Sequence, residues 1–286
     1  MIKILIFNIE CRETRNEDES EGANVYSIAI VNQKGGVGKT TSAVQLAAGL
    51  AERGYRVLAC DMDAQANLTA TALGEGALPK DAPTMYEVLV GEEGPESAIV
   101  AGARCDLLPA AQANKRLSIL DAAIGDRPDK LFRLREALAK VSSAYDFAVI
   151  DTPPARDTLA YNALTAADGV LIPTVAGEYS LNAIGDLAES VDQTRRYTNP
   201  GLRILGVLIT QHRASTRLGK GMAAGAREIA ESLGTHVLPT EIREAVAIGE
   251  SQARYTDIFD YAPRSGVAGD YRHMVDDVLE GVANAG

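Results

Sequence analysis

The chain has 286 residues, of which 46% are apolar and 23% are charged, a balance typical of a folded globular protein rather than of a disordered one. No apolar run approaches the roughly 18 residues of a membrane-spanning helix, and three scattered cysteines without CxxC spacing argue against a disulfide framework or a structural zinc site and fit a reducing cytosol. The formal net charge of −11 excludes a strongly basic nucleic-acid-binding protein, so any DNA contact must come from a local basic patch.

The first 24 residues are predicted to be an extension of the folded domain. Residues 2–9 are apolar enough to form a stray strand, whereas residues 10–22 carry six acidic residues against two arginines. Such a polar segment cannot bury enough apolar surface to fold. We therefore expect residues 1–24 to be disordered and residues 25–286 to form a single domain.

Strand and helix patterns alternate after Val25. Strands are expected at residues 28–31, 56–60, 107–109, 146–150, 169–173, 204–210 and 236–239, and helices at 41–53, 130–141, 180–197, 218–233 and 271–282. Continuous apolar strands separated by amphipathic helices predict an α/β fold, a mostly parallel twisted sheet with helices on both faces. Ligands of such sheets bind beyond the carboxyl ends of the strands, and the strongest polar motifs of this sequence follow such ends.

The first strand leads into a glycine-rich turn, KGGVGKTT at residues 34–41, and then into a helix rich in Ala and Leu. In this context the backbone N–H groups of the turn and the helix N-terminus bind phosphate. The spacing predicts a nucleotide-binding loop in which Lys39 contacts the β- and γ-phosphates and Thr40 contacts Mg²⁺. The full set of expected loop contacts is Lys34, Gly35, Gly36, Val37, Gly38, Lys39, Thr40 and Thr41.

The loop departs from the ordinary P-loop pattern at its start. Gln33 stands where the pattern has its first glycine, and Lys34 adds a second lysine five residues before Lys39. KGGVGKTT resembles the deviant Walker A loop of the ParA/MinD family of P-loop ATPases. The resemblance implies a P-loop NTPase fold, ATP and Mg²⁺ as ligands, and a catalytic Lys34 that reaches across a homodimer interface to the partner's nucleotide.

Two further strands end in carboxylates. DMDAQAN at residues 61–67 is similar to the family's D-x-D-P-Q-G-N segment, with Ala64 and Ala66 in place of Pro and Gly. The resemblance implies that Asp63 positions or activates the hydrolytic water and that Asp61 supports the metal shell. AVIDTPP, which contains Asp151, matches the family's Walker B strand, where the aspartate holds Mg²⁺ directly or through water.

Two other segments resemble parts of the family that surround the nucleotide. Thr210 and Gln211 stand at the end of the expected strand 204–210, where the family commonly holds the adenine, and they are predicted nucleotide contacts. IPTVAGEYSL at residues 172–181 resembles a segment that lies near the dimer interface.

A locally basic region spans residues 203–254, with seven basic residues against five acidic ones, whereas residues 255–286 hold six acidic residues and two basic ones. We expect DNA-phosphate contacts, with strong salt dependence, from Arg213, Arg217, Lys220 and Arg243. PTEIREA at residues 239–245 resembles the family's I-P-R-N-V-R-L-S-E-A stretch, and Arg243 falls on its second arginine. The first arginine is lost, because Thr240 or Glu241 stands there. Solvated helix faces are the alternative interpretation of this region.

The resemblance implies a slow, partner-stimulated ATPase that partitions DNA from the cytoplasm and the nucleoid. ATP would drive a sandwich dimer that binds DNA non-specifically, and a ParB-like centromere-binding partner would stimulate hydrolysis and release. One alternative is a MinD-like ATPase that positions a protein assembly at a surface, although the tail at residues 270–286 is acidic and lacks a basic membrane-binding face. Another is an iron–sulfur reductase, although Cys60 lies within a strand and Cys105 has no evident partner.

Overall fold

The computed structural model describes residues 25–74, 76–110, 116–175, 181–212, 226–228 and 230–284, with only the backbone for residues 181–185. The predicted extension over residues 1–24, with its stray strand at 2–9, lies outside the described residues. Of the predicted helix 218–233, the described residues 226–228 and 230–232 are helical. The residues 176–180 of the segment that resembles the family's dimer interface also lie outside the described part.

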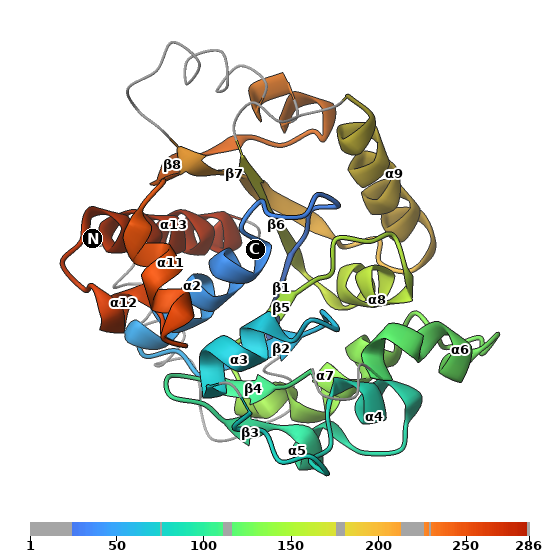
Figure 1. Cartoon of the computed structure of the whole chain (residues 1–286). Helices are drawn as coiled ribbons and strands as arrows, with labels where there is room; N and C mark the ends of the chain where they lie inside the picture. Colours follow the sequence, from blue (N-terminus) through green and yellow to red (C-terminus); the bar gives the residue numbers. More distant parts are fainter. Residues whose placement is uncertain are drawn as a thin grey trace, which may run out of the picture.

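One sheet carries all the strands of the described residues, and seven of its eight strands run parallel (Figure 1). Its order is β3-β4-β2-β5-β1-β6-β7-β8. The prediction of a mostly parallel sheet is confirmed, and the added strand β3 is a two-residue antiparallel edge. The strands are β1 Tyr26–Ile30, β2 Val57–Asp61, β3 Val100–Ala101, β4 Asp106–Leu108, β5 Phe147–Asp151, β6 Gly169–Val175, β7 Arg203–His212 and β8 Val237–Arg243.

Four of the expected helices are present as α2, α7, α9 and α13. The described α-helices are α2 Lys39–Glu52, α3 Asn67–Leu73, α4 Met85–Val90, α5 Pro95–Ala98, α6 Leu120–Ile124, α7 Arg133–Val141, α8 Thr158–Ala166, α9 Leu181–Tyr197, α11 Val246–Ala253, α12 Ile258–Tyr261 and α13 Gly266–Ala283. The helices that sequence reasoning missed have at most nine residues, which is too short for a clear helical period. Local capping signals do mark three of them. Thr84 and Glu87 form a capping box at α4, the Asp157 carboxylate accepts from the Ala160 N–H at α8, and Asp257 caps α12.

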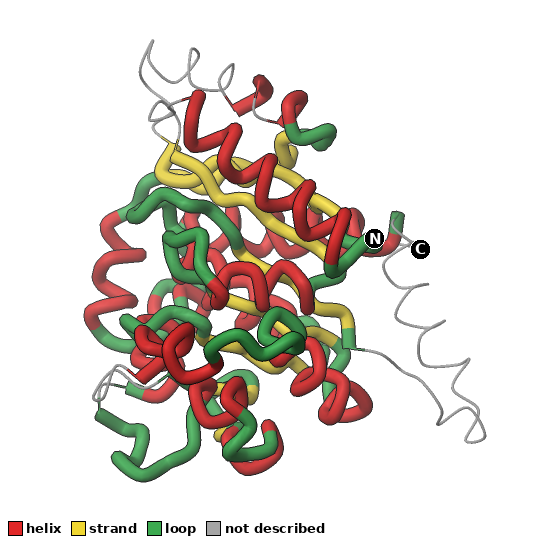
Figure 2. The backbone as a smooth tube through the Cα atoms, turned by 90° about the vertical axis from the view of Figure 1, so that its right-hand side faces the viewer, coloured by secondary structure: helices red, strands yellow, loops and turns green. Residues whose placement is uncertain are grey.

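Helices cover both faces of the sheet, with α2 and α13 on one side and α7, α8 and α9 on the other (Figures 1 and 2). The strands supply both cores because successive side chains point to opposite faces. On β5, Phe147 and Val149 pack in the core under α2, whereas Ala148 and Ile150 pack in the core under α7 and α8. This alternation places Asp151, the next residue of β5, on the α2 face.

Close packing against α13 holds the helix that follows the glycine-rich turn. A side chain added at Gly49 of α2 would meet Val275 Cγ2 at 2.7 Å and the Phe259 ring at 3.4 Å. Small residues therefore let α2 lie deep between the sheet and α13, with its N-terminus at the carboxyl edge of β1. Among the described residues, no helix combines the length and the apolar character that crossing a membrane requires.

Candidate functional site

The glycine-rich turn opens into a pocket of about 480 Å³ at the carboxyl edge of the sheet. Gly36 and Gly38 adopt φ values of 75° and 84°, a left-handed backbone that glycine tolerates best. Six of the eight expected loop contacts line the pocket, and Lys34 and Val37 are the two that do not; the six are Gly35, Gly36, Gly38, Lys39, Thr40 and Thr41. Asp63, Thr210 and Gln211 line it as well, so the tertiary structure brings together residues from three predicted motifs.

Hydrogen bonds from the sheet hold the turn. The Asn32 side chain donates to the Pro173 carbonyl oxygen over 2.8 Å and accepts from the Lys34 N–H over 2.9 Å. The Gln211 amide donates to the Gly36 carbonyl oxygen over 2.9 Å, and the Thr210 hydroxyl lies 2.9 Å from the Val37 carbonyl oxygen. The predicted adenine contacts therefore line the pocket while their own hydrogen bonds go to the turn.

Lys39 is buried at the base of this pocket, with 7% of its surface exposed. Its ammonium donates to the Lys34 carbonyl oxygen over 3.0 Å. Burial lowers the pKa of Lys39, and the negative charges of Asp151 and Asp63 oppose this change. A cation that faces two carboxylates inside a loop of N–H groups is well placed to meet phosphate oxygens.

Asp151 presents a carboxylate with no hydrogen-bond partner among the described residues, although it is completely buried. Burial and the nearby charge of Asp61 raise its pKa well above the ordinary value, and the Thr40 hydroxyl opposes this rise. Buried acceptors are almost always paired, so these oxygens point to a missing partner of positive charge. Magnesium fits, because it takes one or two protein oxygens together with phosphate oxygens and waters. Thr40 and Asp151 could hold it.

Asp61, also completely buried, differs from Asp151 because its oxygens are occupied. One accepts from the Thr69 N–H over 2.8 Å and from the Thr69 hydroxyl over 2.7 Å, and the other accepts from the Asp63 N–H over 3.1 Å. Burial raises the pKa of Asp61 to about 6, against the effect of these bonds. In this arrangement Asp61 shapes the turn after β2 and adds negative charge near Asp151. Of the two aspartates, Asp151 has the free oxygens that a metal needs.

The turn after β2 carries Asp63 and Asn67 into the pocket. The Asp63 carboxylate accepts from the Gln65 N–H over 2.9 Å, so this side chain is oriented by its own turn. Ala66 occupies a left-handed backbone with φ of 52°, the conformation for which the similar family segment uses glycine. The lost glycine is therefore a real departure, and the chain accepts some strain to keep the same turn.

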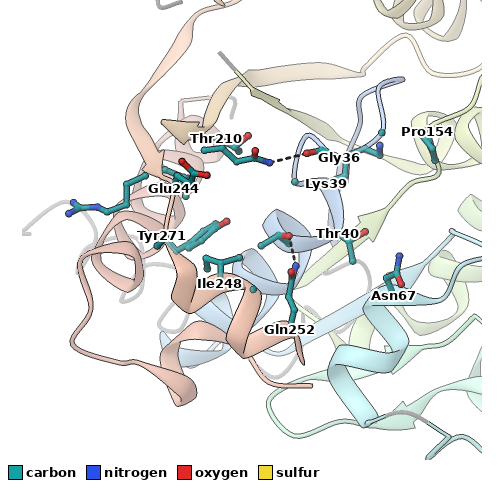
Figure 3. Close-up of a pocket in the computed structure, with 18 of the residues that line it drawn as sticks. Gly36, Lys39, Thr40, Asn67, Pro154, Thr210, Glu244, Ile248, Gln252 and Tyr271 are labelled. Atoms are coloured by element: carbon teal, nitrogen blue, oxygen red, sulfur yellow. Dashed lines mark hydrogen bonds between the residues drawn. The ribbon is translucent and has the colours of Figure 1, made fainter. Parts of the chain in front are cut away.

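The C-terminal part of the chain supplies a wall of the pocket that the motifs did not reveal. In Figure 3, Glu244, Ile248, Gln252 and Tyr271 lie on one side of the loop, and Asn67 and Pro154 lie on the other. The Gln252 amide donates to the Thr41 hydroxyl over 2.7 Å and so ties α11 to α2. No local pattern marks these residues, because they meet the loop only through the fold.

Arg243 lies at the edge of this wall and is paired within the chain. Its guanidinium binds the Asp270 carboxylate of α13 through two bonds of 2.6 and 2.7 Å, while more than half of its side chain remains exposed. The other predicted DNA contacts, Arg213, Arg217 and Lys220, lie outside the described residues. Among the described residues, no three His, Cys, Asp or Glu side chains form a metal-ligand cluster.

Comparisons with known proteins agree with this geometry. A family model described as an AAA domain matches residues 25–204. The chain is 36% identical to the chromosome-partitioning ATPase Soj of Thermus thermophilus over 92% of this chain and 99% of that one. It is 34% identical to the chromosome partitioning protein ParA of Caulobacter vibrioides over 80% and 86%. Among solved structures, cobyrinic acid a,c-diamide synthase from Mycobacterium smegmatis, with a bound ATP analogue and magnesium, is 29% identical with a TM-score of 0.78 over 92% and 97%.

Proposed function

We propose that this chain, which belongs to the ParA/MinD family of P-loop ATPases, hydrolyses ATP in the pocket at the carboxyl edge of its sheet and uses the cycle to partition DNA. The observation that carries the ATPase proposal is the meeting of the loop, Lys39 and the unpaired Asp151 carboxylate in one place. The residues of this site would position the phosphates and neutralise their charge, which is most of what phosphoryl transfer requires.

The loop and four of the side chains around it have proposed roles in that reaction. Lys39 and the N–H groups of the loop bind the phosphates, while Thr40 and Asp151 would hold Mg²⁺, which would offset the negative charge of the phosphates. Asp63 accepts a proton from the attacking water or orients it. Its carboxylate faces the pocket and is held by the Gln65 N–H, so it is pre-positioned for that task.

Lys34 is proposed to act in the partner's site within an ATP-dependent homodimer. It is not among the residues that line the pocket of its own chain, whereas Lys39 is. We therefore expect Lys34→Ala to bind ATP and to lose partner-stimulated hydrolysis, while Lys39→Ala loses nucleotide binding itself. The two lysines serve as matched variants, because they remove the same charge from positions five residues apart.

Partitioning would require the ATP-bound dimer to bind DNA without sequence preference and a ParB-like partner to trigger its release. The relatives named for chromosome partitioning support this proposal. Arg243, Arg213, Arg217 and Lys220 are the proposed phosphate contacts. A location on the nucleoid in the cytoplasm is part of the same proposal, as is a single ATPase domain over residues 25–286.

The C-terminal helix bears on the alternative of a MinD-like ATPase at a membrane surface. The apolar residues Val267, Met274, Val275 and Val278 of α13 are buried against the sheet and α2. Its outer face carries Asp276, which pairs with Arg53, and Asp277, which accepts from the Thr240 N–H. An apolar face that is already packed, beside an acidic one, is a poor match to an anionic membrane.

Retention of non-specific DNA by the purified protein, measured with and without ATP and Mg²⁺ at several salt concentrations, tests the proposal. Wild type should bind only with ATP and Mg²⁺, and log affinity should fall linearly with log salt. Lys39→Ala should abolish the ATP dependence, and Arg243→Ala, at the edge of the pocket, should weaken DNA binding by a larger factor than ATP binding. Failure of wild type to retain DNA at low salt, with ATP hydrolysis intact, would refute partitioning and leave the ATPase.

A further inference from the structure

We propose that Thr210 and Gln211, the two residues near the end of β7, are positioning residues that set the direction of the phosphate-binding N–H groups of the loop. Their role would be to hold the backbone of the loop rather than to read the nucleobase. The inference rests on the proposed nucleotide binding at this loop. The hydrogen bonds concerned join β7 to the loop, and neither sequence motif reveals them by itself.

Each residue bonds a different carbonyl group of the loop. The Gln211 amide donates to the Gly36 carbonyl oxygen over 2.9 Å, as the dashed line in Figure 3 marks. The buried Thr210 hydroxyl lies 2.9 Å from the Val37 carbonyl oxygen and 3.0 Å from the Thr174 carbonyl oxygen. Two consecutive peptides of the loop are therefore attached to the end of one strand.

Attachment of the carbonyl groups also orients the N–H groups. In a planar trans peptide, the C=O of one residue and the N–H of the next point in opposite directions. With the Gly36 and Val37 carbonyls turned toward β7, the N–H groups of Val37 and Gly38 must point away from it. The described residues offer no hydrogen-bond acceptor to the Gly38 N–H. Such oriented N–H groups form the anion-binding surface of a P-loop.

Gln211 has a backbone conformation that is unfavourable for a residue with a Cβ, which indicates a role for its side chain. Gln211 has φ of 53°, and it is one of three non-glycine residues with positive φ among the described residues. Left-handed backbone is unfavourable for a residue with a Cβ, and it persists where surrounding interactions hold it. A glycine would satisfy this conformation but could not bond Gly36. Glutamine is therefore less favourable than glycine for the backbone at this position, but its side chain reaches the loop.

The buried hydroxyl of Thr210 supports the same inference. Thr210 is 3% exposed, and β7 could place a valine of the same shape there at no loss of packing. A valine would remove this donor from the two carbonyl oxygens within its reach. The hydroxyl has one proton, which it can donate to Val37 of the loop or share with Thr174 of β6, so Thr210 lies where the loop, β6 and β7 meet.

The experiment measures the affinity of the full chain for ATP, for GTP and for tripolyphosphate, which has no base. Four variants are compared with wild type: Thr210→Val, Thr210→Ser, Gln211→Glu and Gln211→Gly. Thr210→Val removes the hydroxyl at constant shape and Thr210→Ser restores it. Gln211→Glu replaces the donor by an acceptor that faces a carbonyl oxygen, and Gln211→Gly removes the side chain and relieves the backbone. Thermal unfolding of each variant separates loss of folding from loss of binding.

We expect Thr210→Val and Gln211→Gly to weaken ATP and tripolyphosphate binding by the same factor, about three- to tenfold, the range for one neutral hydrogen bond. Gln211→Glu should weaken both by more, because its carboxylate also repels the phosphates. Thr210→Ser should restore most of the affinity, and the ATP-to-GTP ratio should not move. Gln211→Gly should unfold at the wild-type temperature or above it and still bind less tightly, which a merely structural role does not predict.

Three results would overturn the inference. Unchanged tripolyphosphate affinity in folded variants, or a shifted ATP-to-GTP ratio, would assign these residues to the base instead. Wild type that binds ATP while all four variants match it would remove the inference and leave the proposed function. Wild type that binds neither ATP nor tripolyphosphate, with Lys39→Ala no different, would remove both.

Discussion

Asp61 and Asp151 are paired residues at the carboxyl ends of the neighbouring parallel strands β2 and β5, and both are completely buried. They face the same side of the sheet, yet Asp61 accepts three hydrogen bonds while Asp151 accepts none among the described residues. Burial raises the pKa of each carboxyl group, and the charge of Asp61 raises that of Asp151 further. Two aspartates in equivalent positions therefore have different tasks, and their substitutions should have opposite effects.

Asp151→Asn should stabilise the protein in the absence of Mg²⁺ and nucleotide. Burial and the charge of Asp61 outweigh the favourable effects of the Thr40 hydroxyl and the Lys39 charge at this carboxylate, so the substitution removes a net unfavourable buried charge. We expect a higher free energy of unfolding at pH 7, since burial disfavours the charged form of this carboxylate. Urea denaturation with EDTA measures it. The same variant should lose stabilisation by Mg²⁺ and ATP, and a stability below wild type would contradict the assignment.

Asp61→Asn should destabilise the protein. Its carboxylate accepts from three donors, and an asparagine would turn its own N–H groups toward some of them. We expect a loss of about 1–3 kcal/mol, the penalty for buried groups left unpaired. Thr69→Val is the control that keeps the charge, because it removes one donor to Asp61 together with the acceptor of the Ala110 N–H. Equal denaturation midpoints for Asp61→Asn and wild type would show that these bonds contribute little.

Raising the pH should weaken the Mg²⁺-free protein between about pH 4 and the region above pH 6. The folded pKa values of Asp61, about 6, and of Asp151 lie above the ordinary unfolded value of about 3.9. The folded state therefore binds more protons in this window, so the stabilisation is complete below the unfolded value and is lost as the pH rises. Mg²⁺ affinity should change in the opposite sense and increase with pH. Denaturation in EDTA at pH 5, 6 and 7, with Asp151→Asn as a flatter reference, checks both signs.

Ala66→Gly should raise the unfolding temperature. Ala66 has φ of 52°, a conformation that costs a residue with a Cβ about 1–2 kcal/mol, of which glycine recovers part after its own loss of backbone entropy. We expect a net gain of up to about 1 kcal/mol. Ala70→Gly, inside α3, is the control and should lose about 1 kcal/mol. A lower unfolding temperature for Ala66→Gly would mean that Ala66 is not strained.

Asp270→Asn should increase ATP-dependent DNA retention if Arg243 contacts phosphate. Asp270 holds the guanidinium by two short bonds, so a phosphate must compete with this carboxylate. We expect several-fold tighter binding at low salt, with Arg243→Ala weaker than wild type and its salt slope smaller by about one. The double variant should match Arg243→Ala. An effect of Asp270→Asn that persists without Arg243 would assign the change to general charge.

Much of the fold was accessible from local patterns. The predicted strands at 56–60, 146–150 and 169–173 correspond to β2, β5 and β6 to within one or two residues, because each is a short apolar run with clear turn residues around it. The short helices α8 and α11 were missed because a helix of about two turns is too short to show a repeated apolar spacing. The order of the strands, which makes β2 and β5 neighbours, depends on contacts far apart in the chain.

The phosphate loop could be predicted from local sequence, since the glycines that adopt positive φ, the strand before them and the helix after them are adjacent along the chain. Local sequence also marked Asp61 and Asp151 as strand-end carboxylates. Which of the two keeps free oxygens depends on the folded arrangement, because Thr69 and Asp63 bring their donors to Asp61. The folded arrangement likewise brought Thr210, Gln211 and Gln252 to the loop, since hydrogen bonds between distant segments exist only once the sheet and its helices have packed.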